Sequence, residues 1–259
     1  MQPKTNRTPP IPMVAGIPDP ILEGIAGGWN VEDAADLNDG QILEADVVII
    51  GTGAGGGTTA EILAEAGFKV LMLEEGPLKS TNDFKMDERK AYHDLYQESA
   101  GRMSKDGSMS ILQGRCVGGT TVINWTSSFH TPEETLGYWA EEFKLKGSSK
   151  EEMAPWFERM EKRLNISEWA VPPNENNAVL SRGAEKLGLD WKVIPRNVAG
   201  CWNLGYCGTG CPTNAKQSML VTTIPGALNK DSALVYSARA ERLIIEGKKV
   251  LGVEVTALN

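Results

Sequence analysis

The sequence is poor in histidine, with only His93 and His130 among its 259 residues. Histidine is the side chain whose ordinary pKa best suits proton transfer near neutral pH, so its scarcity limits acid–base chemistry. His93 lies in a polar stretch and is interpreted as a surface residue. His130 precedes Thr131-Pro132 and is interpreted as a structural loop residue, although it could line a site. We therefore predict no catalytic histidine in this chain.

Cysteine is also scarce, which excludes a disulfide scaffold. A zinc or iron–sulfur site normally takes four ligands with closely spaced cysteine pairs, whereas three of these cysteines are spaced by six and four positions without a nearby histidine. We therefore predict no metal site. A disulfide between Cys207 and Cys211 is the alternative to free thiols, which suit a cytosolic protein. The four cysteines are Cys116, Cys201, Cys207 and Cys211.

Long apolar runs and clusters of positive charge are missing as well. The apolar run 47–50 is far shorter than the roughly 20 residues that span a bilayer. Residues 1–13 are rich in proline and polar side chains and lack the apolar centre of a secretory signal. The net charge of −8 and the absence of a basic run predict no nucleic-acid partner. We expect a cytoplasmic protein, with peripheral membrane contact left open.

The chain does contain the pattern of an α/β fold. Residues 45–50 are predicted to form a strand, because 47–50 are contiguous and β-branched, as in a parallel strand covered on both faces. A helix is predicted over 55–66 and a second strand over 69–73, which together form one right-handed βαβ unit. Further predicted elements are a short helix at 20–26, helical segments within 83–97, 131–164 and 180–187, a strand at 233–237 and a hairpin over 240–246 and 250–256.

A glycine-rich turn, Gly51-Thr52-Gly53-Ala54-Gly55-Gly56, joins the first strand to the first helix. This strand–turn–helix context is what the dinucleotide-binding motif G-x-G-x-x-G requires. Gly51 permits the tight turn, Gly53 lets the backbone approach a pyrophosphate, and Gly56 lets the helix pack close to the strand. The helix N-terminus supplies free N–H groups and a positive dipole to the phosphates. A turn without any ligand is the plainer alternative.

An acidic residue completes the pattern, because Glu74 directly follows the second strand. It lies near the spacing of about 20 residues at which an acid binds the ribose hydroxyls of a dinucleotide. Glu75 competes for the same role, and we prefer Glu74 because it follows the apolar strand without a gap. The motif alone does not separate NAD from FAD.

Two segments together resemble the glucose–methanol–choline (GMC) oxidoreductase family. The first, Val47–Pro77, ends its second strand in Leu73-Glu74-Glu75-Gly76, where the family has a Leu-Glu-Ala-Gly-like sequence and Glu75 replaces the small residue. The second, Gly114-Arg115-Cys116-Val117-Gly118-Gly119-Thr120-Thr121-Val122-Ile123-Asn124, matches the family's Gly-Arg, Gly-Gly-Ser/Thr and Ile-Asn signature. A third segment, 205–218, is similar to the branch with long-chain alcohol oxidases and membrane-linked alcohol or sugar-acid dehydrogenases.

This resemblance implies a Rossmann-like FAD-binding domain with a parallel sheet and a partial, mostly helical insertion. It places residues 118–121 beside the pyrophosphate, Asn124 near the flavin ring and the Ala240 backbone near adenine. Some members attach FAD covalently through a histidine at the position of Ile123, so we predict non-covalent FAD. The expected cofactor-binding residues are Gly51, Thr52, Gly53, Ala54, Gly55, Gly56, Glu74, Glu75, Arg115, Gly118, Gly119, Thr120, Thr121, Asn124 and Ala240.

The implied activity is alcohol oxidation by hydride transfer to flavin N5, with a small-molecule alcohol as substrate. The electron acceptor, whether oxygen, a quinone or a cytochrome, is left open. In the family a histidine with a neighbouring histidine or asparagine takes the hydroxyl proton, so we expect that pair beyond Asn259 and interpret the chain as truncated. On its own it should be inactive, poorly soluble and weak in binding FAD. The alternatives are an NAD-dependent Rossmann dehydrogenase and a non-enzymatic dinucleotide-binding module.

The same reading divides the chain into four parts. Residues 1–44 are an N-terminal extension, and 45–130 are the first part of the FAD-binding domain. Residues 131–225 are a helical and loop insertion toward the substrate side, and 226–259 return to the FAD-binding domain, which they leave incomplete.

Overall fold

The structure is a computed structural model that describes residue 17 and residues 19–258. The N-terminal stretch 1–13 therefore lies outside the described residues. The chain divides into two compact units, residues 1–125 with 201–259 and residues 126–200. The predicted insertion, 131–225, has other bounds. Residues 201–225 belong to the first unit because helix α7 (Thr223–Leu228) packs against helix α2 (Ala54–Glu65).

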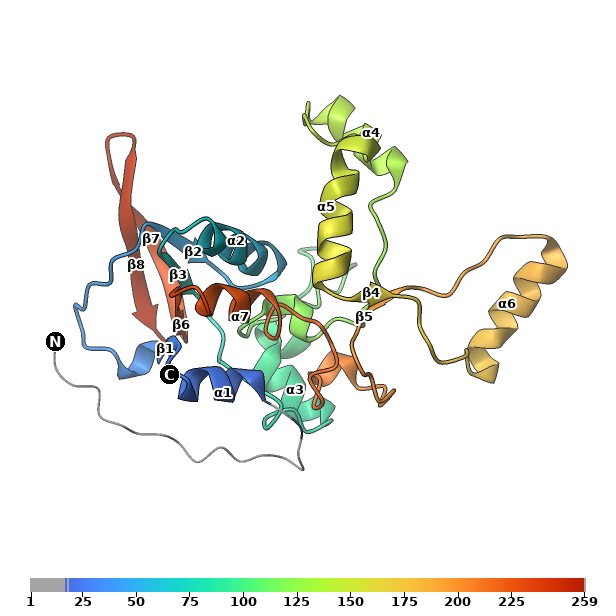
Figure 1. The fold of residues 1–259 in the computed structure, drawn as a ribbon, viewed down its shortest axis with the longest axis horizontal. Helices are drawn as coiled ribbons and strands as arrows, with labels where there is room; N and C mark the ends of the chain where they lie inside the picture. Colours follow the sequence, from blue (N-terminus) through green and yellow to red (C-terminus); the bar gives the residue numbers. More distant parts are fainter. Residues whose placement is uncertain (1–16, 18, 259) are drawn as a thin grey trace. The chain divides into compact units, whose positions relative to one another are not determined.

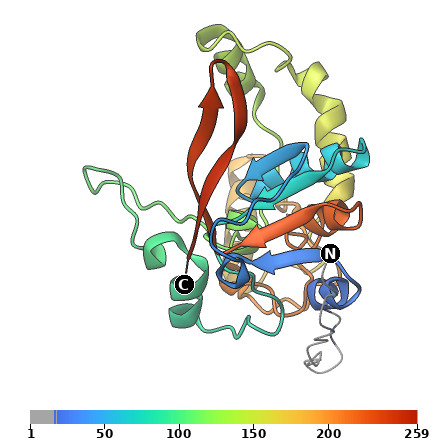
Figure 2. The ribbon, with the colours of Figure 1, turned by 90° about the vertical axis from the view of Figure 1, so that its left-hand side faces the viewer.

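A four-stranded parallel sheet in the order β1-β6-β3-β2 organises the first unit (Figure 2). Its strands β2 and β3 pair from Val47↔Val70 to Ile50↔Leu73, so the predicted βαβ unit is confirmed. Strand β1 pairs along its whole length with β6, which corrects the expectation that residues 1–44 only precede the fold. The strands are β1 (Asn30–Asp33), β2 (Val47–Ile50), β3 (Val70–Leu73) and β6 (Ala233–Tyr236).

The central strands form the core, whereas the edge strand β2 leaves side chains on one of its faces exposed. All four residues of β3 are buried. In β2, Ile49 faces α2, since its Cγ2 lies 3.2 Å from where a Cβ on Gly56 would be. Val48 and Ile50 point to the other face and are 37% and 55% exposed. The prediction that this strand is covered on both faces is therefore wrong for this structure, because Val48 and Ile50 remain exposed in the part of the chain that the structure describes.

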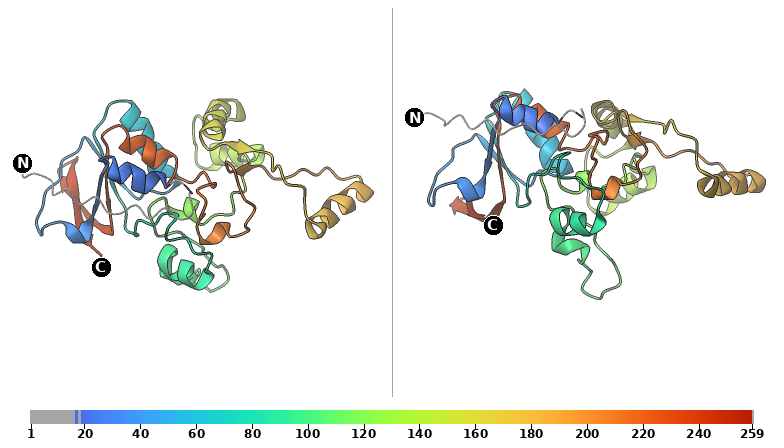
Figure 3. Two further views of the ribbon diagram at one scale, coloured as in Figure 1. Left: turned by 60° about the horizontal axis from the view of Figure 1, so that its bottom comes forward. Right: turned by 90° about the horizontal axis from the view of Figure 1, so that it is seen from below.

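Short helices surround the sheet. The predicted helix at 20–26 is confirmed as α1 (Pro20–Ala26), whose N-cap Asp19 accepts hydrogen bonds from the backbone of Ile21 and Leu22. Helices α1 and α7 lie side by side (Figure 3), and Trp29 Nε1 donates a 2.8 Å bond to Asn229 Oδ1. The other helical elements of this unit are η1 (Ala34–Asp36), α3 (Glu88–Leu95), η2 (Gln97–Ala100), η3 (Gly119–Val122) and η4 (Cys207–Thr209).

The predicted hairpin is confirmed as a separate antiparallel pair, β7 (Ala238–Glu246) and β8 (Lys249–Ala257). Its turn contains Gly247, whose φ of 61° suits glycine. The hairpin extends past the parallel sheet (Figure 1), and much of its apolar surface is exposed. The exposed apolar side chains are Leu243, Ile244, Ile245, Val250, Leu251 and Val255.

The second unit is mostly helical. A capping box at Ser149 starts α5 (Lys150–Arg163), and Gly188, in the left-handed conformation, ends α6 (Glu175–Leu187) as predicted. Trp139, Phe143 and Trp156 are exposed. Within the described chain, α5 and α6 bury no residue and α4 buries only Leu136. None of the described helices combines the length and hydropathy that crossing a bilayer requires. The unit's elements are α4 (Glu133–Glu142), α5 (Lys150–Arg163), β4 (Ile166–Ser167), α6 (Glu175–Leu187) and β5 (Arg196–Asn197).

Candidate functional site: two glycine segments in contact

The turn between β2 and α2 has the conformation that its glycines predict. Gly51 has a φ of 89°, in the region that favours glycine. A Cβ on Gly56 would lie 1.9 Å from the Gly51 carbonyl oxygen, so only glycine allows α2 to start this close to the strand. Gly53 is the N-cap of α2 and provides no side-chain cap, while Ala54 and Gly55 are exposed. The first turn of α2 thus presents backbone N–H groups to an approaching anion.

The second glycine segment lies directly against this turn. Gly118 and Gly119 have φ values of 93° and 55°. A Cβ on Gly119 would lie 2.8 Å from the Cα of Gly53, a distance that real side chains do not reach. The two motifs, far apart in sequence, therefore meet backbone to backbone, with no side chain between them.

Thr52 joins three parts of the site, a role that the sequence did not indicate. It is fully buried, and its hydroxyl donates to Glu74 Oε2 at 2.6 Å and accepts from the Gly118 N–H at 2.9 Å. Its own N–H also donates to Glu74 Oε2, at 2.9 Å, while Glu74 Oε1 accepts from the Gly76 N–H at 2.9 Å. Glu74 is 7% exposed. In this structure its carboxylate therefore organises the turn, besides any role toward ribose.

Glu75, the acid that competes with Glu74 for the ribose role, is hydrogen-bonded to two arginines. Its Oε1 accepts from Arg115 Nε and from Arg239 Nη2, each at 3.0 Å. Partial burial raises the pKa of Glu75, but the hydrogen bonds and charges of the two guanidinium groups outweigh it and hold that pKa below its ordinary value. Arg115 is thus placed as a partner of Glu75, and Arg239 on β7 ties the hairpin to the same carboxylate.

The predicted threonine hydroxyls shape the loop that carries them. Thr120 Oγ1 accepts from the Gly114 N–H at 3.0 Å. Thr121 Oγ1 donates to the Gly118 carbonyl at 2.6 Å and accepts from the Met219 N–H at 3.0 Å, so its proton is already in use. Asn124 is partly buried at the end of this loop. Ala240 pairs with Val255 in the hairpin, next to a β-bulge.

A buried lysine, Lys216, connects this loop to the cysteine-containing loop. It is 2% exposed, and its Nζ donates to the carbonyl oxygens of Val122 at 2.6 Å, Asn124 at 2.8 Å and Cys207 at 2.6 Å. The sequence held only an indirect signal for this residue, namely its place in the segment 205–218. Burial and the Glu74 charge raise the pKa of the Cys116 thiol, and the Lys216 charge opposes them.

The cysteines and histidines do not form a second centre here. All four cysteines are free thiols in the structure. No group of three or more potential metal ligands occurs among the described residues, and the absence of a metal stays a prediction. His93 is exposed and bonds Asp94 at 2.9 Å. His130 bonds Glu161 at 2.7 Å and stacks on Phe157.

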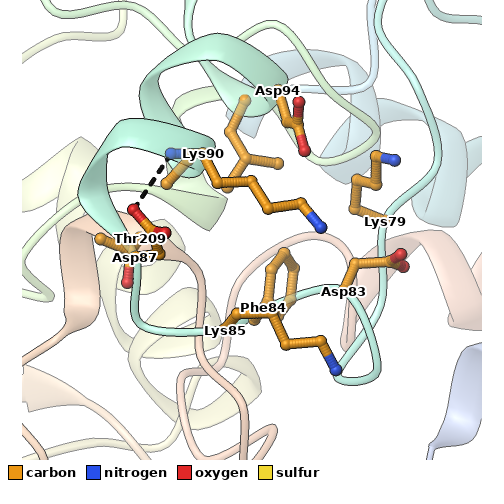
Figure 4. A pocket seen from close by; sticks show the side chains of 10 residues that line it. Lys79, Asp83, Phe84, Lys85, Asp87, Lys90, Asp94 and Thr209 are labelled. Carbon is orange, nitrogen blue, oxygen red and sulfur yellow. Dashed lines mark hydrogen bonds between the residues drawn. The ribbon is translucent and has the colours of Figure 1, made fainter.

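A surface pocket lies beside α3 rather than at the glycine turn (Figure 4). Three aspartates at this pocket are engaged by nearby groups: Asp83 accepts from the Ser80 N–H, Asp87 caps α3, and Asp94 pairs with His93. The remaining lining residues are Lys79, Phe84, Lys85, Lys90, Ala91, Leu95 and Thr209. None of the predicted cofactor-binding residues lines this pocket, so it is not the predicted cofactor site.

Two solved structures share the fold of this chain. Pyridoxine 4-oxidase from Mesorbium loti matches with a TM-score of 0.60 at 18% identity, over 83% of this chain and 46% of its own. A formate oxidase matches with a TM-score of 0.55 at 19% identity, over 82% of this chain and 42% of its own. These likenesses confirm the predicted α/β fold.

Sequence relatives point to one family. Long-chain-alcohol oxidase FAO4A of Arabidopsis thaliana is 35% identical over 74% of this chain and 27% of its own length. The GMC-type oxidoreductase y4nJ of Sinorhizobium fredii is 34% identical over 81% of this chain and 42% of its own length. The chain thus spans less than half the length of these relatives. The model of the family described as GMC oxidoreductase matches residues 92–259, which include the second glycine segment. The chain belongs to the GMC oxidoreductase family.

Proposed function

We propose that this chain binds FAD non-covalently and is the cofactor-binding part of an oxidoreductase that acts on CH–OH groups. The observation that carries the proposal is the contact between Gly53 and Gly119, where a side chain would lie 2.8 Å from backbone. Neither motif alone creates this junction, and both are needed to form a backbone cradle at the uncapped start of α2.

The residues of the chain would divide the work of holding the cofactor. The first N–H groups of α2 suit a pyrophosphate, whose charge the helix dipole favours. Gly118 and Gly119 run alongside without side chains, and Asn124 lies at the flavin end of the same loop. Glu74 is the acid we assign to the ribose, with Glu75 beside it. When bound, FAD supplies the redox chemistry by accepting a hydride at flavin N5.

The substrate we propose is a small-molecule alcohol, which the names of the long-chain-alcohol oxidases among the relatives support. The electron acceptor stays open between oxygen, a quinone and a cytochrome. We assign no proton-accepting base among the described residues, because His93 and His130 are both exposed and paired with carboxylates. A cytoplasmic location, with contact to a membrane surface, stays a prediction from the sequence.

Equilibrium dialysis of the purified chain against FAD and against NAD tests the proposal. We expect saturable binding of FAD and no binding of NAD, which separates a flavoprotein from an NAD-dependent dehydrogenase. Alcohol-dependent bleaching of the flavin absorbance, measured on the protein at the length of its relatives, separates an enzyme from a binding module. Binding of NAD with no affinity for FAD would refute the proposal.

A further inference from the structure

We propose that Lys216 is a positioning residue that clamps the cysteine-containing loop, residues 201–216, onto the backbone of residues 122–124 and so fixes Asn124 beside the cofactor. Its Nζ donates three bonds of 2.6–2.8 Å to carbonyls of Val122, Asn124 and Cys207. This proposal rests on the proposed function in one respect, the placing of Asn124 at the flavin end.

The three bonds match the donors of a charged lysine. An ammonium has three N–H donors, whereas a neutral amine has two, and three carbonyl oxygens within 2.8 Å need three protons. A buried charge is costly unless it is hydrogen-bonded, and this one is bonded in all three directions. The carbonyls of Val122, Asn124 and Cys207 are thereby oriented toward a single point.

The segment that contains Lys216 supports the loop 118–124 at a second place. The Met219 N–H donates to Thr121 Oγ1 at 3.0 Å, and Thr121 in turn donates to the Gly118 carbonyl. A continuous set of contacts therefore runs from Lys216 and Met219 through the loop to Gly118, whose N–H bonds Thr52 in the first motif. Lys216 lies at the end of this set that is nearest Asn124.

The cysteine-containing loop is held from its other side by different residues. The Tyr96 hydroxyl donates to the Gly208 carbonyl at 2.7 Å. A Cβ on Gly210 would lie 2.2 Å from the Phe84 ring, so the backbone packs directly on that ring. These contacts fix the loop but do not bond the carbonyls of residues 122 and 124. Loss of Tyr96 and loss of Lys216 should therefore have separable effects.

Hydrogen–deuterium exchange on the FAD-free chain tests the clamp. We expect Lys216→Met to increase exchange at residues 122–125 and 207–209 by about tenfold or more, because buried carbonyls lose a charged donor. Tyr96→Phe should increase exchange at 207–209 and leave 122–125 protected. Lys230→Met, which removes an exposed lysine of the same unit, should match the wild type.

FAD affinity, measured by flavin fluorescence, tests the link to the cofactor. We expect Lys216→Met to raise the Kd for FAD about tenfold, the effect of losing one charged hydrogen bond. Lys216→Arg keeps the charge and the donors, so it should recover most of the affinity for FAD. If Lys216→Met does not fold, Lys216→Arg is measured in its place. A lysine that only holds the two loops together would leave the FAD affinity of a folded Lys216→Met variant unchanged.

The outcomes are distinguishable. Unchanged exchange at residues 122–125 in a folded Lys216→Met variant would overturn the clamp. Increased exchange with wild-type FAD affinity would overturn the positioning role. A wild-type chain that binds no FAD would instead refute the proposed function, and the exchange experiment would still decide whether Lys216 holds the two loops together.

Discussion

The Thr52 hydroxyl donates a 2.6 Å hydrogen bond to the buried carboxylate of Glu74. Thr52 occupies a variable position of the glycine motif and Glu74 the end of the next strand, so one bond joins the two features by which the sequence predicts a dinucleotide site. The same hydroxyl accepts from the Gly118 N–H. The first motif, the acid and the second motif therefore form one bonded unit before any ligand is considered.

Replacement of Thr52 by valine should destabilise the chain. Valine keeps the shape but leaves the Gly118 N–H and one of the Glu74 contacts unsatisfied in the interior, at a cost of about 1–3 kcal/mol. Urea unfolding followed by circular dichroism measures this change. Thr52→Ser keeps the hydroxyl and should lose less. Equal stability of the valine and wild-type chains would show that the bonded unit is unimportant.

A side chain at Gly119 should prevent the two motifs from meeting. Alanine there would bring Cβ to 2.8 Å from the Gly53 Cα and adopt a φ of 55°. The left-handed conformation alone costs about 1 kcal/mol, and backbone cannot move aside as a flexible side chain can. We expect FAD binding to fall at least tenfold in a fluorescence titration. Gly137→Ala, in open space on helix α4, is the control and should bind FAD like the wild type.

The Glu75 ion pairs predict a dependence on pH and salt. Because the folded pKa of Glu75 is lowered, its contribution to stability is present above the ordinary glutamate pKa of about 4.3 and is lost as the pH falls through the folded pKa. Its side chain is 34% exposed, so the effect should be small and screened by salt. Thermal melts between pH 7 and pH 3 should show a shallower acid decline for Glu75→Gln. A decline as steep as that of the wild type, at low salt, would contradict this.

The sequence predicted the local elements near the glycine turn well because each is determined by short-range chemistry. The strand at 47–50, the turn glycines and the hairpin turn at Gly247 all follow from residue type and spacing. Contacts between segments far apart in the sequence could not be predicted from the sequence alone. Pairing of β1 with β6 depends on residues far apart in sequence, and a four-residue strand, Asn30–Asp33, has no apolar alternation to indicate it.

The candidate site shows the same limit. The motif singled out Glu74 at the end of the second strand, but it did not indicate that this carboxylate would accept from Thr52 and Gly76. Lys216 was missed as a buried residue because lysine is usually exposed, and only the three carbonyls that surround it reveal its place. The exposed Trp139 and Trp156 show the converse, since large aromatic side chains predict burial only where a partner element is present.

Cys116 should be unreactive while the chain is folded. It is 1% exposed, and burial with the nearby Glu74 charge raises its pKa, so the reactive thiolate is depleted. Cys201, Cys207 and Cys211 are all partly exposed. Alkylation with iodoacetamide at pH 8, followed by peptide mass spectrometry, should label Cys116 at least tenfold more slowly than Cys201. Equal labelling of Cys116 and Cys201 in the folded chain would contradict the buried position of Cys116. Equal labelling that occurs only after urea is added would not contradict it.

Acid precipitation should separate the flavin from the protein. Covalent attachment in some family members uses a histidine at the position of Ile123, and isoleucine offers no nucleophile. The Ile123 side chain is also 3% exposed, so this position contributes to the core in the present structure. We expect trichloroacetic acid to leave a yellow supernatant and a colourless pellet from the FAD-loaded protein. A pellet that keeps its flavin after washing in denaturant would show a covalent bond to another residue and would refute non-covalent binding.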